Sequence, residues 1–321
     1  MTDKRAAIQI SADTLPVALS SFQRDLVLSA CPRGTSIRSA RPIREGTCLC
    51  PLWVETRLPR GTLHAVLLRL DRMQGGVEHE ARLLPHLART GLPVATVLAG
   101  PSVDPDAPQL GAMAVYSVLP GQNLLQRLYQ ADAAQKVVLA GLLLDAIDSM
   151  QALTAPLERI LEEAGRSALL PRKGLAYEFR AAASADRLLD QSELREAVAA
   201  LAPRVHAVQE SLVFWNGDFN PANFLSDGER ITGYVDFVHA AWHDPHYGLA
   251  RYTIYPWIHL DRPALFAEYR RRHRVSEGDF ALRSAVHCLW MLAGCSDHVL
   301  DETDAAIIRG QLRQDLHVLG T

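Results

Sequence analysis

The sequence predicts an α+β protein with two lobes, a small mixed lobe at the N-terminus and a larger, mainly helical lobe after it. Strand-like segments and one helical pattern fill residues 1 to about 118. An apolar, strand-like run at 111–119 is then interrupted by Pro120-Gly121, and helical patterns dominate the chain beyond it. We therefore expect an N-terminal lobe at 1–118, a connecting segment at 119–123 and a helical lobe at 124–321.

Residues 47–55 and 63–70 read as the first strands of the small lobe. Both segments are mainly apolar, and the turn residues 59–61 (Pro-Arg-Gly) separate them. A helical pattern follows at 77–90, where apolar side chains recur at near-helical spacing. Gly91 stands just past its end, where a helix C-cap glycine is expected.

The helical lobe begins with a long apolar pattern at 131–153, which predicts its central helix. Residues 154–211 contain further helical segments rich in Ala, Glu and Arg. The remaining helices are expected at 249–260, 264–272, 280–295 and 301–319.

Composition limits the classes of partner. The chain has 321 residues, of which 48% are hydrophobic and 21% charged, as in ordinary globular proteins. A net charge of −3 gives no basic field to attract nucleic acid or an anionic membrane. The N-terminus lacks the apolar core of a signal peptide, and uninterrupted apolar runs are short. We expect a cytoplasmic protein without nucleic-acid or membrane partners; the oligomeric state is left open.

Cysteine and lysine usage excludes further site types. The five cysteines are odd in number and form no C-x-x-C pair, which argues against a disulfide framework or a structural zinc site. We expect reduced thiols in the core. Only Lys4, Lys136 and Lys173 occur among 33 lysine and arginine residues, and none completes a P-loop motif.

Residues 215–250 carry most of the candidate chemistry. Asp218 is followed five positions later by Asn223, and Asp236 comes at the end of a later apolar run. Short strand-like segments at 212–215, 223–225 and 231–237, with the turn Ser-Asp-Gly at 226–228, predict strand, loop and hairpin. Such a hairpin places Asp218 and Asn223 in its entry loop and Asp236 at its far end, so the three side chains can converge.

Convergent oxygen donors of this kind suit Mg²⁺. Phosphoryl transfer requires one carboxylate to orient the attacking hydroxyl group and accept its proton, and an Asn and a second Asp to hold the metal against the phosphates. The protein-kinase signature is H-R-D, four residues, N, and then D-F-G. This chain has N-G-D, four residues, N, and then D-F-V, so the spacing is kept although flanking letters differ.

The run N-G-D-F-N-P-A-N-F, followed by V-D-F and W-H-D-P-H-Y-G-L-A, resembles the aminoglycoside phosphotransferase and choline kinase-like family. That family has a protein-kinase-like fold and phosphorylates hydroxyl groups of small molecules. The resemblance implies that Asp218 is the catalytic Asp and that Asn223 and Asp236 are Mg²⁺ ligands. It also implies that Asp244 is a buried carboxylate that braces the catalytic loop.

Several residues depart from the family's pattern, which is close to H-G-D-L-H-P-x-N. Asn216 and Asn220 stand where histidines are common, and Gly248 stands where an Asp often precedes L-A. Relatives often close the central helix with Leu-His, whereas this chain has Met150-Gln151. None of these changes replaces the three residues with chemical roles.

The resemblance also implies a nucleotide site, with ATP as co-substrate and GTP as a possible alternative. Adenine would lie against the hinge at 115–121, with Val115 and Val118 as contacts. Arg69 ends its strand where the family has a lysine, or in some branches an arginine. Glu80 would be its partner, since Glu78 falls on a different helical face.

Two nucleotide-site assignments have simpler alternatives. Arg69 can be a solvated charge at the end of a strand. Gly46, in the run Arg-Glu-Gly-Thr at 44–47, can contact the phosphates or belong to an ordinary turn.

Three other groups of residues each have a functional and a structural interpretation. The histidines can bind zinc or make local hydrogen bonds; they are His239, His243 and His246. The acidic run can attract a cationic substrate or begin a solvated helix; it consists of Asp297, Asp301, Glu302 and Asp304. The aromatic group can form a cage for an ammonium ion or pack in the core; it consists of Trp242, Tyr252, Tyr255 and Trp257.

The sequence thus predicts a Mg²⁺-dependent kinase that transfers the γ-phosphoryl group of ATP or GTP to a hydroxyl group of a small molecule. An antibiotic acceptor, and hence antibiotic resistance, is favoured because the motif block is nearest to the drug kinases. The alternatives are a metabolite kinase acting on a sugar or amino alcohol, and a catalytically silent nucleotide-binding module. Retention of Asp218, Asn223 and Asp236 together favours an enzyme.

Overall fold

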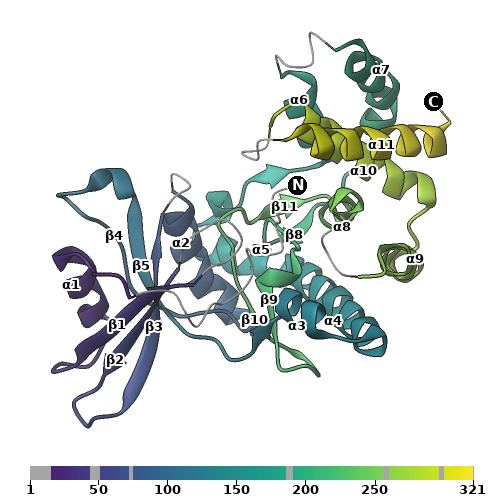
Figure 1. Ribbon diagram of the computed structural model, residues 1–321. Coiled ribbons are helices and arrows are strands. Elements are labelled where there is room, and N and C mark those ends of the chain that lie inside the picture. The colour runs from purple at the N-terminus through teal and green to yellow at the C-terminus, as the bar shows by residue number, and fades with distance from the viewer. Residues whose placement is uncertain are drawn as a thin grey trace.

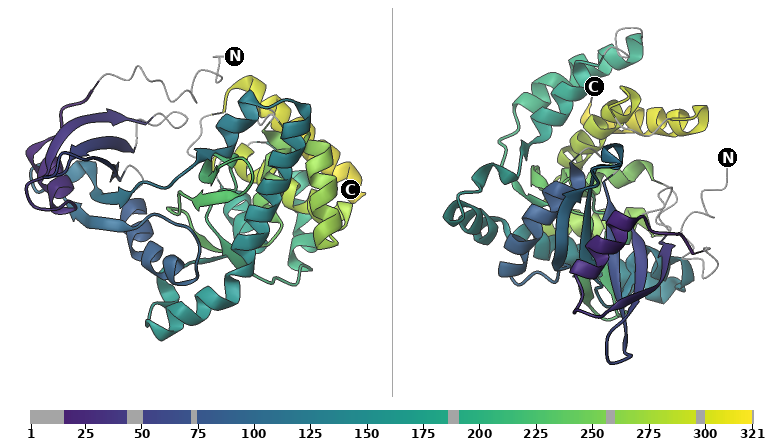
Figure 2. Two further views of the ribbon diagram at one scale, coloured as in Figure 1. Left: turned by 90° about the horizontal axis from the view of Figure 1, so that it is seen from below. Right: turned by 90° about the vertical axis from the view of Figure 1, so that its left-hand side faces the viewer.

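The computed structural model describes residues 16–43, 51–71, 75–185, 191–255, 260–295 and 300–320. One part of the molecule is built on a five-stranded sheet, and the other is mainly helical with two small sheets (Figure 1). Two further directions of view show the same division (Figure 2). The chain passes from one part to the other between Ser117 and Leu124.

The large sheet has the order β1-β2-β3-β5-β4 with antiparallel neighbours throughout. The hairpin expected from the turn at 59–61 is confirmed, because Arg57 pairs with Leu63 and Gly61 has a φ of 87°. The strands are β1 (Ser36–Pro42), β2 (Leu52–Arg57), β3 (Leu63–Leu70), β4 (Val97–Val103) and β5 (Ala112–Ser117).

Helices α1 (Ser21–Ser29) and α2 (Gly76–Arg89) cover opposite faces of this sheet. Strand alternation sends Met113 and Val115 of β5 into the cluster that contains Val27 of α1. Ala114 and Tyr116 of the same strand join the cluster that contains α2. The predicted helix at 77–90 is confirmed and ends at Thr90, followed by Gly91 with a φ of 84°.

The helical part contains nine α-helices among its described residues, and they confirm the long helix predicted at 131–153 as well as those predicted near the C-terminus. They are α3 (Leu124–Gln130), α4 (Ala133–Ala152), α5 (Thr154–Glu163), α6 (Leu175–Ala183), α7 (Ser192–His206), α8 (Tyr247–Ala250), α9 (Arg262–His273), α10 (Glu277–Leu292) and α11 (Glu302–Leu319). The short 3₁₀ segments are η2 (Pro108–Leu110), η3 (Ser167–Leu169), η5 (Pro221–Asn223) and η6 (Arg251–Ile254).

Two small sheets lie among these helices. One has the order β10-β9-β6 and the other β7-β11-β8. The predicted hairpin is present as β9 and β10, but the preceding strand β8 pairs with β11 instead. Their strands are β6 (Gln122–Asn123), β7 (Arg172–Lys173), β8 (Val213–Trp215), β9 (Phe224–Ser226), β10 (Ile231–Tyr234) and β11 (Ala241–His243).

The helix expected at 249–260 is not continuous. Four residues of α8 are followed by the 3₁₀ turn η6, and Tyr255 has a φ of −105° and a ψ of 82°, outside helical values. The expectation was therefore wrong for residues 251–255, and 256–259 lie outside the described residues.

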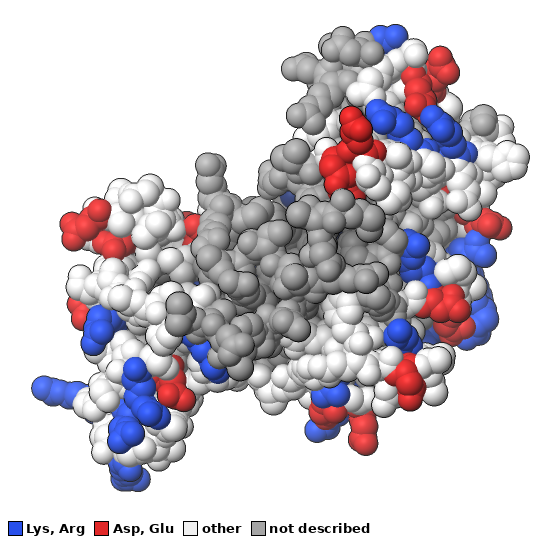
Figure 3. All heavy atoms as spheres, in the orientation of Figure 1, with Lys and Arg blue, Asp and Glu red and all other residues white. Residues whose placement is uncertain are grey.

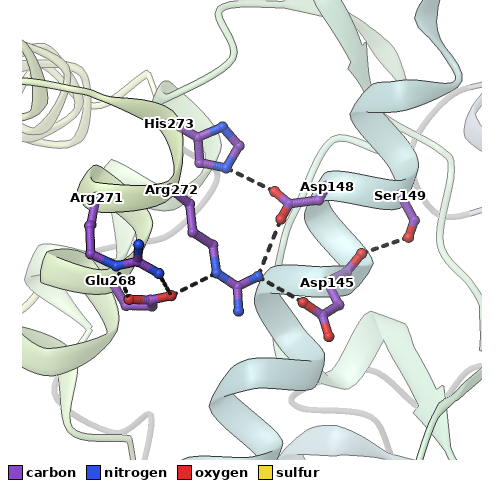
Figure 4. Close-up of polar contacts among 7 residues, drawn as sticks. All are labelled: Asp145, Asp148, Ser149, Glu268, Arg271, Arg272 and His273. Atoms are coloured by element: carbon purple, nitrogen blue, oxygen red, sulfur yellow. Dashed lines mark hydrogen bonds and ion pairs between the residues drawn. The ribbon is translucent and has the colours of Figure 1, made fainter.

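A polar cluster joins α9 to α4 (Figure 4). The guanidinium group of Arg272 contacts Asp145 at 2.7 Å and Asp148 at 3.3 Å, while its Nε donates to Glu268. His273 Nε2 lies 2.8 Å from Asp148. One arginine thus connects carboxylates from two helices that are more than a hundred residues apart in the chain.

Charges of both signs are spread over the face shown in Figure 3. Basic atoms gather at the end of the large sheet that includes the β2–β3 turn, in which Arg57 and Arg60 are exposed. Although uninterrupted apolar runs are short, the stretch Ala133–Glu163 is long and apolar enough to cross a membrane by length and composition alone. In this fold it forms α4 and α5, and α4 contributes Leu143, Ile147 and Met150 to the main core.

Candidate active site

The loop that follows β8 is held closely against the segment after β10. Gly217 has a φ of 106°, a conformation that other L-residues seldom adopt. A Cβ atom there would lie 2.4 Å from the Cβ atom of His239. Glycine is therefore required for this close approach, which brings the residue before Asp218 beside the residue three positions after Asp236.

Two side-chain amides fix the backbone of Asp218. Asn216 Nδ2 and Asn223 Nδ2 donate to the Asp218 carbonyl oxygen at 3.0 and 2.9 Å. The Asp218 N–H group donates to Asn216 Oδ1 at 3.2 Å. Because the Asn223 amide nitrogen is used in the loop, its Oδ1 atom is the one that can bind a cation.

The carboxylate of Asp218 receives its hydrogen bonds on one oxygen. The hydroxyl group of Tyr252 donates to Asp218 Oδ1 at 2.5 Å, and the Asn220 N–H group donates to the same atom at 3.3 Å. Arg251 Nη1 donates to the Gly217 carbonyl oxygen at 3.1 Å. Burial alone would lower the pKa of Arg251, but Asp218 and the neighbouring tyrosines together raise it by more, so the net shift is upward.

Arg69 connects two carboxylates from different parts of the chain. Its Nη1 lies 2.9 Å from both oxygens of Glu80, and its Nη2 lies 2.5 Å from Asp236 Oδ1. The side chain of Glu80 is 3% exposed, and the Phe237 N–H group also donates to it at 2.9 Å. Burial lowers the pKa of Arg69, but Glu80 and Asp236 raise it further, so the guanidinium stays charged.

Asp236 has an unusual backbone conformation. Its φ of 64° lies in the left-handed region, which costs energy for a residue with a Cβ atom. The preceding residue, Val235, donates its N–H group to the Asn223 carbonyl oxygen at 3.0 Å. This bond places Asn223 and Asp236 at the same end of the β9–β10 hairpin.

The description "Phosphotransferase enzyme family" belongs to a family model that matches residues 60–284, which is more than half of the chain. The chain belongs to this family. The resemblance seen in the motif block is thereby confirmed, and the protein is a phosphotransferase. A search of curated proteins gives no match.

Solved structures share the fold at low sequence identity. A thermostable mutant of aminoglycoside phosphotransferase APH(4)-Ia, in ternary complex with ADP and hygromycin B, has a TM-score of 0.62 at 15% identity, covering 88% of this chain and 94% of that chain. A second variant of the thermostable APH(4)-Ia, in ternary complex with AMP-PNP and hygromycin B, has a TM-score of 0.65 at 16% identity, covering 94% of this chain and 100% of that chain. APH(2")-IIIa with GDP and kanamycin gives 0.60 at 17%, covering 93% and 99%. The expected two-lobed, protein-kinase-like α+β fold is confirmed.

The remaining predicted nucleotide residues of this phosphotransferase lie as follows. Val115 is fully buried on the α1 side of the sheet, between β3 and β4, whereas Val118 is half-buried. Glu78 pairs with Arg82 on the surface rather than with Arg69. Gly46 lies outside the described residues.

Asp244 is buried, as expected, but its partners differ from those expected. Arg283 of α10 binds both of its oxygens at 3.2 and 3.0 Å, and the N–H groups of His246 and Tyr247 donate to it. Burial would raise the pKa of Asp244, yet Arg283 lowers it below the usual value. This carboxylate therefore ties the start of α8 to α10.

Gly248 of α8, rather than Asp244, packs against the loop that contains Asp218. A Cβ atom at Gly248 would lie 2.7 Å from the ring of Phe219 and 3.0 Å from Trp215 Nε1. The glycine that replaces the family's usual Asp thus lets α8 pack directly on the loop. Gln151, in place of the family's histidine, donates from Nε2 to the Pro245 carbonyl oxygen at 2.6 Å.

The three histidines of the phosphotransferase do not form a common site among the described residues. His243 contacts Glu178 at 3.1 Å, and His246 contacts the Tyr269 hydroxyl group at 3.1 Å. His239 lies near Asp218 and Asp236, whose charges raise its pKa, but burial is the larger effect and the net shift is downward. Hydrogen bonding, rather than zinc, accounts for the observed partners of His243 and His246.

Described members of the other two groups have packing or capping partners. Trp242 packs against Phe214 with ring centroids 6.1 Å apart, whereas Tyr252 packs against Tyr255 at 5.5 Å. Asp301 caps α11 by accepting the N–H group of Asp304 at 2.8 Å, as a helix start does. Trp257 and Asp297 lie outside the described residues, as do Cys48 and Cys50; Cys31, Cys288 and Cys295 are free thiols.

The donor set of the phosphotransferase fits Mg²⁺ rather than zinc. Across the described ranges, no group of three or more His, Cys, Asp or Glu side chains is placed to hold a metal ion by itself. Asp236 is 38% exposed and Asn223 offers an amide oxygen, both hard ligands. Mg²⁺ is commonly held by one or two protein oxygens together with substrate phosphates, which matches this arrangement.

Sequence reasoning missed Arg251 and Tyr252 as site residues. Both follow directly on the L-A that ends the motif block, and both side chains return to the catalytic loop. Their nearness to that block is the only sequence signal. A cavity of about 460 Å³ lies elsewhere, beside Leu92, Leu142 and Tyr234, and its lining includes none of the predicted site residues.

Proposed function

We propose that this phosphotransferase is a Mg²⁺-dependent kinase that transfers the γ-phosphoryl group of ATP or GTP to a hydroxyl group of a small molecule. Residues 1–118 would bind the nucleotide, 119–123 would connect the lobes, and 124–321 would bind the acceptor. The observation that carries the proposal is the closely held loop containing Asp218 and Asn223, linked through Val235 to Asp236 and through Asp236 to Arg69 and Glu80.

In this reaction Asp218 would orient the acceptor hydroxyl group. The acceptor oxygen forms a bond to the γ-phosphorus, the bond from that phosphorus to the β,γ-bridging oxygen breaks, and the hydroxyl proton passes to Asp218. Because such transition states are loose, Asp218 acts mainly by positioning. Asn223 and Asp236 would hold the metal, which supplies positive charge against the phosphate oxygens.

Arg69 would bind phosphate oxygens where a lysine is usual. Its guanidinium group remains charged and can make paired hydrogen bonds to phosphate. Its Nη2 atom donates to Asp236 Oδ1, and a cation bound by Asp236 would compete with that contact. Binding of the metal and release of Arg69 toward the phosphates are therefore expected to occur together.

The acceptor is proposed as an antibiotic or another small hydroxylated molecule. Support comes from the structures with the same fold that hold hygromycin B or kanamycin beside a nucleotide. A sugar or amino alcohol is the alternative acceptor, because one fold serves many substrates.

The test is mass spectrometry of a pooled set of antibiotics, sugars and amino alcohols incubated with the protein, Mg²⁺ and either ATP or GTP. Asp218→Asn is the control, since it removes the proton acceptor and keeps the size of the side chain. We expect one class of compound to gain a phosphoryl group with the unchanged protein and only a trace of it with the variant. Nucleotide binding should persist in the variant. Binding of nucleotide without any transfer would favour a silent binding module instead.

A further inference from the structure

We propose that Tyr252 is a positioning residue that assigns different tasks to the two oxygens of Asp218. Its hydroxyl group would hold Oδ1 in place and so direct Oδ2 toward the acceptor hydroxyl group. The inference rests on the proposed function, in which Asp218 receives the acceptor proton, and it extends that function to a residue beyond the motif block.

The hydrogen bonds on Asp218 are unequally divided between its oxygens. Tyr252 donates to Oδ1 at 2.5 Å, and the Asn220 N–H group donates to Oδ1 at 3.3 Å. Oδ2 receives no hydrogen bond from any residue that the structure describes. A carboxylate held by one oxygen has a fixed orientation, and its other oxygen remains able to accept a proton.

Tyr252 is itself held rigidly. It is 5% exposed and lies in η6, directly after α8. Its ring lies beside that of Tyr255, and with Phe219 and Leu249 it lines a small apolar cavity behind the catalytic loop. The ring is thus packed among neighbours while its hydroxyl group contacts Asp218.

The direction of the hydrogen bond follows from charge. Burial, and then the negative charge of Asp218, raise the pKa of Tyr252 well above its ordinary value. The phenol therefore stays protonated and donates. Arg251, the preceding residue, binds the Gly217 carbonyl oxygen, so its positive charge lies near the carboxylate without occupying Oδ2.

This arrangement has a consequence for the transfer step. While the acceptor oxygen approaches phosphorus, its proton moves to Oδ2, and Oδ1 keeps its bond to Tyr252. Without the phenol, the carboxylate can rotate about its Cβ–Cγ bond, and fewer complexes have Oδ2 in line with the acceptor. Small displacements of this kind are costly for transfer reactions.

The test is Tyr252→Phe, assayed with the acceptor found by mass spectrometry. We expect kcat to fall by about ten- to hundredfold, with the nucleotide KM unchanged. Fluorotyrosine at position 252, which keeps the ring and the donor, should retain most of kcat, because the hydrogen bond to Asp218 Oδ1 is kept.

Tyr269→Phe is the matched control. It removes another buried tyrosine hydroxyl group, which donates to the Pro245 carbonyl oxygen at 2.8 Å and makes no contact with Asp218. We expect Tyr269→Phe to lower Tm and to leave kcat of the folded protein unchanged. Thermal melts of both variants separate loss of folding from loss of positioning.

A double-variant cycle tests whether Tyr252 acts through Asp218. In the Asp218→Asn background, Tyr252→Phe should reduce the residual turnover no further. Equal losses in both backgrounds, or an unchanged kcat in Tyr252→Phe, would overturn the proposal while the kinase function stands. Absence of turnover by the unchanged protein would instead remove the proposed function, and the role of Tyr252 with it.

Discussion

Arg69 stands at the centre of a chain of charges in which each partner depends on the others. Its side chain is 24% exposed, whereas that of Glu80 is 3% exposed. Removing the arginine would leave a buried carboxylate without its cation, which is more costly than removing both charges together.

We therefore expect Arg69→Ala to lower the free energy of unfolding by about 3–5 kcal/mol, measured by denaturant titration. Adding Glu80→Ala should recover part of that loss, because no unpaired charge remains. Arg82→Ala is the control, since Arg82 and Glu78 form an exposed pair at 63% and 44% exposure, and it should change little. A double variant no more stable than Arg69→Ala would contradict the coupling.

Gly248 gives a second prediction for a single residue. Gly248→Ala would press a methyl group against Phe219 and Trp215, and we expect destabilisation of about 1–3 kcal/mol and a lower kcat, because Phe219 adjoins Asp218. Gly310→Ala is the matched control in α11, where a Cβ atom would meet nothing within 4 Å. It should be neutral or stabilising. Thermal melts compare the two, and equal Tm values would count against the packing argument.

For single residues, the sequence predicted the contacts between residues that a motif spacing relates. Asp218 and Asn223 come together in the loop, and the predicted pair of Arg69 with Glu80 forms. The contact of Arg69 with Asp236 was not predicted, because no spacing rule relates residues 167 positions apart. Tyr252 was considered only as part of an aromatic group, since the sequence does not show where its hydroxyl group points.

Among the elements, α11 contains an acid in an apolar setting. Asp315 is 4% exposed, and burial raises its pKa to about 6 from an ordinary 3.8. Gln311 donates to Oδ1 at 2.9 Å, while Oδ2 is buried without a partner among the described residues. The folded protein holds this proton more tightly than the unfolded chain does. The resulting contribution to the free energy of unfolding is complete at pH values below the unfolded pKa of 3.8, and it is lost as pH rises through the folded pKa of about 6.

Asp315→Asn should remove this dependence. We expect the variant to be more stable than the unchanged protein at pH 8, by on the order of 2 kcal/mol, and not more stable at pH 4. Melting temperatures at both pH values measure the difference. The same gain at both pH values would show that a cause other than titration is responsible.

Element positions followed from periodicity, but their partners did not. The hairpin of β9 and β10 was predicted from its turn, whereas the pairing of β8 with β11 depends on residues that are not adjacent in sequence. The helix predicted from residue 249 breaks at η6, because Arg251 and Tyr252 turn back to the loop. Tertiary contacts of this kind override local preference.

At the scale of the whole molecule, the hydrophobic clusters do not follow the division of the chain into an N-terminal and a C-terminal part. Helix α2 comes early in the chain, yet Leu83, Leu84 and Leu87 belong to the same core cluster as residues of α4 and β10. The connection after α2 is also bound to β10, because the Tyr234 N–H group donates to the Pro93 carbonyl oxygen at 2.9 Å. The outer face of the large sheet and α1 form a separate, smaller cluster.

Native-state hydrogen exchange should follow these clusters rather than chain order. We expect amides of α2 to exchange together with those of α4, and amides of α1 and β1 to exchange faster and independently. Mass spectrometry of peptides from the exchanged protein distinguishes the groups. If α2 exchanged with β1 and independently of α4, the shared core would not act as one cooperative unit.

Gln151 has a consequence for how the enzyme responds to acidity. A histidine in this position, as relatives often have, would gain a proton and a charge as the surroundings become mildly acidic. The carboxamide of Gln151 has no such proton to gain, and it donates to Pro245 in one form only. The hydrogen bond from the central helix to Pro245, just before α8, is therefore the same in neutral and in mildly acidic surroundings.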